Sequence, residues 1–169
     1  MWNETSLSKL AEDEPNKRNL INVYWCLKNE EKEVLNRTKK TARCMRETNL
    51  LMSMTGVGDL SSLIILAEIG DIKRFPSPKE LVNYTGLCPG IYQTGSTERT
   101  VRNNAVNKWL KWIIYECSER AIMLDPRFQK YFSKVQQRKG YQTGRRAAAR
   151  KMITIIWYML TNGEPYRAS

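Results

Sequence analysis

A long stretch without glycine or proline, Leu20 to Leu51, dominates the N-terminal part of the chain. Its apolar positions recur loosely at helical spacing, with Glu31 as an interruption, and are Leu20, Tyr24, Leu27, Val34, Thr38, Ala42 and Met45. This pattern predicts one long helix that could act as a coiled-coil arm. The polar segment before it, Met1 to Asn19, contains Pro15 and is expected to be a loop or a disordered terminus.

Turns rich in glycine and proline divide the rest of the chain into shorter helices. The predicted helices cover Asp59 to Ile69, Pro78 to Tyr84, Asn107 to Met123, Asp125 to about Arg138, and Gly144 to Leu160. Asp59 is expected to cap the first of these helices, residues 86–95 to form a loop or short strand, and residues 140–144 to form a loop. The predicted fold is therefore mostly α-helical. A helical arm covers residues 1–50, and a helical domain that contains a helix-hairpin-helix covers residues 51–166.

Composition excludes several classes of enzyme. The 169 residues include no histidine, so Ser-His-Asp hydrolases, Cys-His proteases and HExxH metalloproteases are ruled out. The four cysteines form no CxxC pair, which speaks against a zinc ribbon or a disulfide framework, and we expect free thiols. The N-terminus has no apolar signal core, and no apolar run approaches the length of a membrane span. We therefore expect a soluble, cytoplasmic protein with no membrane association.

The charge of the chain points to a localised binding surface. The net charge is +11, and residues 91–169 hold fifteen basic and five acidic side chains. Nine basic residues lie between Arg127 and Lys151 with no acidic residue among them. On the predicted helix 107–123, Lys108, Trp112 and Tyr115 should share the face away from the core. A basic surface with neighbouring aromatic rings suits nucleic acid, although charge runs often form only a solvated face. The predicted phosphate contacts are Arg99, Arg102, Lys108, Lys111, Arg145, Arg146, Arg150 and Lys151.

The motif Thr55-Gly56-Val57-Gly58 lies between two predicted helices. In a helix-hairpin-helix module, such a turn presents the first backbone N–H groups of the second helix to a DNA phosphate. We therefore include Gly56 and Gly58 among the candidate nucleic-acid contacts. The alternative is a plain turn that needs glycine for its left-handed backbone.

A hydroxyl-rich segment runs from Gln93 to Arg102. A hydroxyl group can attack a phosphodiester when arginine side chains or a metal stabilise the developing charge, but an ordinary turn has the same composition. The carboxylates Asp59, Glu68 and Asp71 are too few and too scattered for a two-metal nuclease. We assign no metal site and expect these groups to serve as surface charges and caps.

Several motifs in unbroken order resemble the C-terminal domain of insertion-sequence-110 type transposases. They are Met52 to Gly58, Leu66 to Ile72, Arg74-Phe75, Tyr84 to Pro89, Tyr92 to Gly95, Asn107 to Trp112, Asp125-Pro126, Ala149 to Lys151 and Asn162 to Tyr166. The resemblance covers roughly residues 50–166, and residues 20–50 fit the helical arm that precedes this domain in such proteins.

The resemblance implies a DNA recombinase. Family members combine a carboxylate domain that binds divalent metal with a C-terminal domain that supplies a serine nucleophile in a Ser-Gly dipeptide. Here the dipeptide reads Thr94-Gly95, so Thr94 is the candidate nucleophile, and Val106 replaces the family's glycine before Asn107. We expect no cofactor in this chain, and Mg²⁺ only together with the carboxylate domain, for which the chain has no room.

The predicted function is DNA binding and strand transfer in DNA transposition. The partners expected are DNA, a guide RNA as known in the family, and a second copy of the chain through the N-terminal helix. The alternative is a non-catalytic nucleic-acid-binding fragment, or a regulator that dimerises with a full-length transposase.

Overall fold

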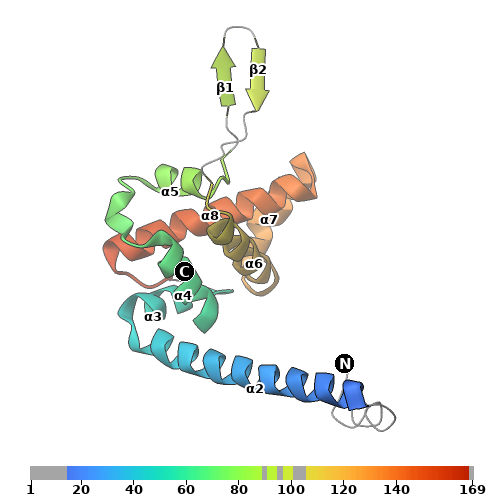
Figure 1. Cartoon of the computed structure of the whole chain (residues 1–169). Helices are drawn as coiled ribbons and strands as arrows, with labels where there is room; N and C mark the ends of the chain where they lie inside the picture. Colours follow the sequence, from blue (N-terminus) through green and yellow to red (C-terminus); the bar gives the residue numbers. More distant parts are fainter. Residues whose placement is uncertain (1–14, 89–90, 95–96, 101–105, 168–169) are drawn as a thin grey trace. The chain divides into compact units, whose positions relative to one another are not determined.

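The computed structural model describes residues 15–88, 91–94, 97–100 and 106–167. The described chain is mostly α-helical, as predicted (Figure 1). It divides into two compact units, Met1–Thr41 and Ala42–Ser169. The predicted boundary between residues 50 and 51 stays a prediction.

Most of helix α2 (Pro15–Cys44) belongs to the first unit. The helix begins earlier than predicted because proline is well suited to the first helical turn, where its missing N–H is not needed. Several apolar side chains of α2 are exposed, namely Leu20, Val23, Tyr24, Leu27 and Val34. An apolar stripe cannot bury itself within a single helix. The stability of α2 therefore has to come from contacts outside the helix.

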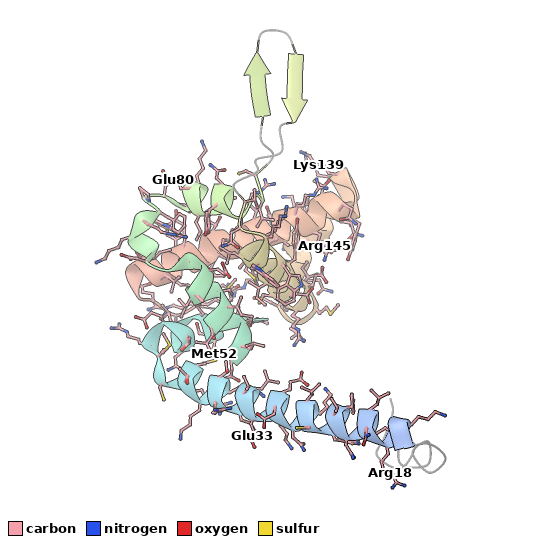
Figure 2. All side chains as sticks on the ribbon, in the orientation of Figure 1. Arg18, Glu33, Met52, Glu80, Lys139 and Arg145 are labelled. Atoms are coloured by element: carbon pink, nitrogen blue, oxygen red, sulfur yellow. The ribbon has the colours of Figure 1, made fainter. Side chains whose placement is uncertain are left out.

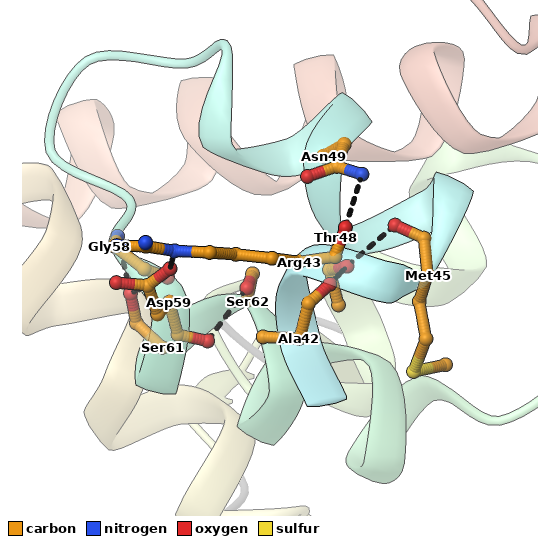
Figure 3. A network of polar contacts seen from close by, with 9 residues as sticks. All are labelled: Ala42, Arg43, Met45, Thr48, Asn49, Gly58, Asp59, Ser61 and Ser62. Carbon is orange, nitrogen blue, oxygen red and sulfur yellow. Dashed lines mark hydrogen bonds and ion pairs between the residues drawn. The ribbon is translucent and has the colours of Figure 1, made fainter. Parts of the chain in front are cut away.

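The single long helix predicted from Leu20 to Leu51 is wrong, because the chain breaks at Met45 and continues as α3 (Arg46–Met52). Side chains of α3 add hydrogen bonds to backbone carbonyl groups at the break (Figure 3). The buried Thr48 hydroxyl lies within hydrogen-bond distance of the backbone oxygens of Ala42 and Met45, and Asn49 Nδ2 donates to the backbone oxygen of Arg43 at 2.9 Å. The backbone oxygens of Ala42 and Met45 also accept from the Met45 and Asn49 N–H groups, and the side-chain bonds add to these and stabilise the break.

The second unit, which also contains α4 (Asp59–Ile69), is built around α8 (Tyr141–Asn162), which packs against most of its other helices. Its neighbours are α3, the 3₁₀ helix η1 (Ile72–Arg74), α5 (Pro78–Tyr84), α6 (Lys108–Leu124) and α7 (Pro126–Lys139). Its buried Met152, Ile153 and Ile156 each contribute about 1.5–3 kcal/mol by leaving water. They join a core that includes Leu51, Ile65, Leu81, Leu110, Ile114 and Phe128.

The loop predicted for residues 140–144 is also wrong, because α8 begins at Tyr141. Gly144 lies inside the helix, and a Cβ atom there would come within 3.1 Å of the Phe132 ring of α7. The glycine therefore permits close packing of α7 on α8 and does not break the helix. Asp59 is the first residue of α4 and not its N-cap, which is Gly58.

A two-stranded antiparallel sheet follows α5 in the chain. It pairs β1 (Ile91–Thr94) with β2 (Thr97–Thr100), and Thr94 lies opposite Thr97. This agrees with the prediction of a loop or short strand between Gly86 and Gly95.

Candidate nucleic-acid interface

The basic run of the sequence forms a helical hairpin. Helix α7 and the first half of α8 carry all nine of its cations, and the two helices pack together after the turn at Gly140. Lys130, Lys134 and Arg138 are exposed and follow one another at intervals of four residues, so they form a stripe roughly 12 Å long. Lys139 and Arg146 are exposed near the turn, and Figure 2 shows Lys139 close to the end of α7.

Three of the four cations predicted on α8 have partners within the protein. Arg145 pairs with Glu119, and its guanidinium lies 4.9 Å from the centre of the Tyr115 ring. Arg150 Nε donates to the backbone oxygen of Leu87 at 3.2 Å. The ammonium group of Lys151 lies 4.6 Å from the centre of the Tyr131 ring and 5.5 Å from that of Phe128. These side chains help to hold the helices together, and their predicted phosphate contacts stay predictions.

Helix α6 presents cations and aromatic rings on its first two turns. Lys108 and Trp112 are exposed and Lys111 is half-buried. Tyr115 does not face away from the core as predicted, since it packs against the core beneath Arg145. Trp109, which was not among the predicted contacts, is the most exposed tryptophan among the described residues, at 67%. Its place outside the apolar stripe of α6 could have indicated this exposure.

The glycine turn between α3 and α4 is packed closely against α6. Gly56 has φ +93°, and a Cβ atom on it would lie 2.4 Å from the backbone oxygen of Cys117. The Gly58 N–H donates to Ser61 Oγ at 2.7 Å, and Asp59 accepts from Arg43 at 3.0 Å (Figure 3). This geometry gives both glycines a structural role. Their predicted role in DNA binding stays a prediction.

The residues predicted to carry chemistry lie in or beside the β-hairpin. Thr94 ends β1, and Arg99 of β2 pairs with Tyr92. Gly95, Ser96 and Arg102 lie outside the described residues. The structure brings Thr94 and Arg99 into one hairpin of known register.

Asn107 connects three helices in a polar cluster. Its Nδ2 donates to Glu68 at 2.6 Å and to the Tyr84 hydroxyl at 3.0 Å, and its Oδ1 accepts from the Leu110 N–H. The Arg74 guanidinium lies 4.8 Å from the centre of the Tyr84 ring. The pKa of Tyr84 is lowered, chiefly by the hydrogen bond from Asn107 and then by Arg74. The cluster leads into α6 and fixes the start of that helix.

The C-terminal segment returns to the junction of α6 and α7. The Tyr166 hydroxyl donates to the buried Asp125 carboxylate at 2.9 Å, and the Tyr166 N–H donates to Ser53 Oγ at 2.8 Å. Burial raises the pKa of Asp125, but hydrogen bonds from Arg127 and Tyr166 outweigh it, and the pKa is lowered overall. The pKa of Tyr166 is raised, chiefly by burial of its hydroxyl and secondly by the hydrogen bond to Asp125.

Two expectations from the sequence concern metal sites and membrane-spanning helices. Within residues 15–88, 91–94, 97–100 and 106–167, no group of three or more His, Cys, Asp or Glu side chains could hold a metal ion. The three carboxylates considered for a metal site have other partners. Asp59 accepts from Arg43, Glu68 accepts from Asn107, and Asp71 caps η1 by accepting from the Lys73 N–H at 2.9 Å. In the same described ranges, no helix is long and apolar enough to cross a membrane.

The chain belongs to the IS116/IS110/IS902 family of transposases, whose sequence model matches residues 48–133, just over half of the chain. Over 142 residues it is 25% identical to the transposase for insertion sequence element IS1111A of Coxiella burnetii, covering 76% of this chain and 37% of that protein. Over 123 residues it is 28% identical to a 43.6 kDa protein of insertion element IS110 from Streptomyces coelicolor, covering 70% of this chain and 30% of that protein. The chain thus spans about a third of the length of these curated relatives.

Proposed function

We propose that this chain binds DNA in DNA transposition, and that the exposed cations of the α7–α8 hairpin contact the phosphate backbone. One observation carries the proposal: residues 126–151 hold nine cations and no carboxylate, and the exposed ones include the stripe Lys130, Lys134 and Arg138. A stripe about 12 Å long passes roughly seven duplex charges, at about 1.7 Å per charge. The family membership supports DNA as the ligand. We also propose that this work takes place in the cytoplasm.

The affinity for duplex DNA across a salt series tests this proposal. The triple variant Lys130→Gln, Lys134→Gln, Arg138→Gln should make the slope of log K against log salt shallower by about 2.7, since each phosphate contact contributes about 0.9. The matched control is Lys32→Gln, Lys39→Gln, Lys40→Gln, which removes the same charge from exposed positions on α2. Equal slopes for the two triple variants would overturn the assignment of the hairpin as the docking surface.

We further propose that Thr94 is the nucleophile if the chain takes part in strand transfer. Its hydroxyl would attack the phosphorus of a phosphodiester and form a threonine O–P bond. The P–O bond to one deoxyribose breaks, its oxygen takes up the proton and leaves as a free hydroxyl, and the DNA stays joined to the protein as phosphothreonine. The described residues hold no metal cluster, so any Mg²⁺ would bind to the carboxylate domain that the family resemblance implies. A denaturation-resistant DNA adduct that disappears in Thr94→Ala and persists in Thr94→Ser supports this role. An adduct that persists in Thr94→Ala refutes it.

The second candidate function is non-catalytic binding of DNA or guide RNA. Threonine at the nucleophile position favours it, because the additional methyl group crowds the hydroxyl and restricts χ1. It predicts salt-dependent binding with no adduct in wild type or in any Thr94 variant. An adduct formed by the wild-type chain would reject it.

We also propose self-association through α2, whether or not the chain is catalytic. Leu20, Leu27 and Val34 are exposed and seven residues apart, the spacing of one coiled-coil position. Leu20→Asp with Leu27→Asp should convert an oligomer into a monomer in light scattering, and Asn22→Asp with Asn29→Asp should not. An unchanged mass for the leucine variant would exclude this helix as the interface.

A further inference from the structure

Two tryptophan side chains lie next to each other on the surface of α6. Trp109 is 67% exposed and Trp112 48%, and their ring centres are 6.2 Å apart in an edge-to-face arrangement. Tryptophan has the largest apolar surface of any side chain and is mostly buried in folded proteins. Two exposed rings side by side indicate a surface that a ligand covers.

The charged residues on the first two turns of α6, where this pair lies, are both positive. Lys108 is exposed one helical turn before Trp112, and Lys111, half-buried, adjoins Trp112 in the sequence. Residues 108–115 contain no acidic residue, and the first carboxylate on the helix is Glu116, one turn beyond Trp112. Aromatic faces next to ammonium groups match a nucleotide, which combines a flat base with a negative phosphate. An apolar protein surface would gain nothing from the lysines.

From this arrangement we infer that Trp109 and Trp112 stack on unpaired bases of a nucleic-acid strand whose phosphate groups contact Lys108. The inference rests on the proposed function and specifies its ligand further. Bases within a duplex stack on each other and hide their faces, so this surface selects single-stranded segments or flipped-out bases. Neither ring takes part in the α7–α8 hairpin, so the two contacts can be tested separately.

The test compares binding of a labelled dT20 strand, a U20 strand and a 20-base-pair duplex to the full chain. Trp109→Leu with Trp112→Leu should weaken binding of the single strands at least about fivefold per residue, since base stacking contributes about 1–3 kcal/mol per base. Duplex affinity should change less than about twofold. Trp109→Phe with Trp112→Phe should keep most of the affinity for single strands, because phenylalanine retains a flat ring. Met123→Ala with Leu124→Ala removes exposed apolar surface from the other end of α6 and is the matched control.

Equal affinity of the leucine variant and wild type for both single strands would overturn the inference and leave the proposed function intact. The same holds if the leucine variant keeps its affinity but loses self-association in light scattering, because the rings would then contact protein. Absence of salt-dependent binding to any of the three probes would overturn both proposals. Loss of affinity for only one of the two strands supports the inference and identifies the ligand as DNA or RNA.

Discussion

Gly56→Ala separates the structural role of the glycine turn from the role in DNA binding that the sequence predicts for it. The new methyl group would lie 2.4 Å from the backbone oxygen of Cys117 and 2.9 Å from the backbone nitrogen of Ala121. Both atoms belong to the backbone of α6, so no side-chain rotation relieves the clash. Alanine would also have to adopt φ +93°.

The size of the effect follows from these two terms. A left-handed backbone costs an L-residue roughly 1–2 kcal/mol, and overpacking against a closed core costs about 1–3 kcal/mol more. We therefore expect Gly56→Ala to reduce the free energy of unfolding by about 2–5 kcal/mol. Gly163→Ala is the matched control, because Gly163 has φ +69° and its nearest neighbour is an ordinary 3.6 Å contact with Arg46. It should lose only the backbone term of about 1–2 kcal/mol.

Equilibrium unfolding in urea, followed by circular dichroism, measures both variants. A shift of the midpoint with an unchanged m-value reports stability alone. If Gly56→Ala loses no more than Gly163→Ala, the close approach to α6 is refuted. Below the unfolding transition, Gly56→Ala should bind duplex DNA with the wild-type salt slope. A stable variant with a shallower slope would instead place the turn on the phosphate backbone, as the helix-hairpin-helix interpretation predicts.

Three further outcomes are expected from the polar clusters. Tyr166→Phe should destabilise the chain by about 1–3 kcal/mol in urea, since Asp125 loses a hydrogen bond within a buried site. Because the pKa of Asp125 is lowered in the fold, its ionised form stabilises the protein above the unfolded pKa of about 3.9, and this stability is lost as pH falls through the folded pKa. A wild-type advantage over Tyr166→Phe that persists unchanged to pH 2 would contradict this linkage. Asn107→Ala removes the N-cap of α6 and should lower the free energy of unfolding by about 1–2 kcal/mol. Thermal unfolding can measure this loss, with Asn83→Ala at an exposed position as the control.

Helices with local start and stop signals were predictable from the sequence. The bounds of α5 and α4 agree with the prediction, because Pro78 and the flanking glycines act on their own neighbours. The break at Met45 has no such signal, since it depends on the side chains of Thr48 and Asn49 reaching back to the end of α2. Gly144 was wrongly predicted to lie in a loop. It lies within α8 and makes room for the Phe132 ring of α7, a contact that the local sequence does not indicate.

The basic surface was predictable as a region but not residue by residue. Charge along the sequence identifies the α7–α8 hairpin, and burial then separates the exposed cations from those used in packing. Arg145 and Arg150 have partners at Glu119 and Leu87, and no periodicity within α8 indicates residues so distant in the chain. Part of the net charge therefore stabilises the fold. For this reason, we expect the measured salt slope to reflect the exposed cations and not all nine.

Five of the segments that carry the family resemblance contact one another through side-chain hydrogen bonds that support the fold. Asp125, from one motif, accepts from Tyr166 of another, and Asn107 joins Glu68 to Tyr84, which come from three separate motifs. Both groups of contacts lie where helices begin or end. The spacing of these motifs along the chain therefore reflects contacts between them in the fold. It follows that substituting these motif residues tests folding. The proposed nucleic-acid binding has to be tested at exposed positions outside these contacts, above all Lys130, Lys134, Arg138 and the two tryptophans of α6.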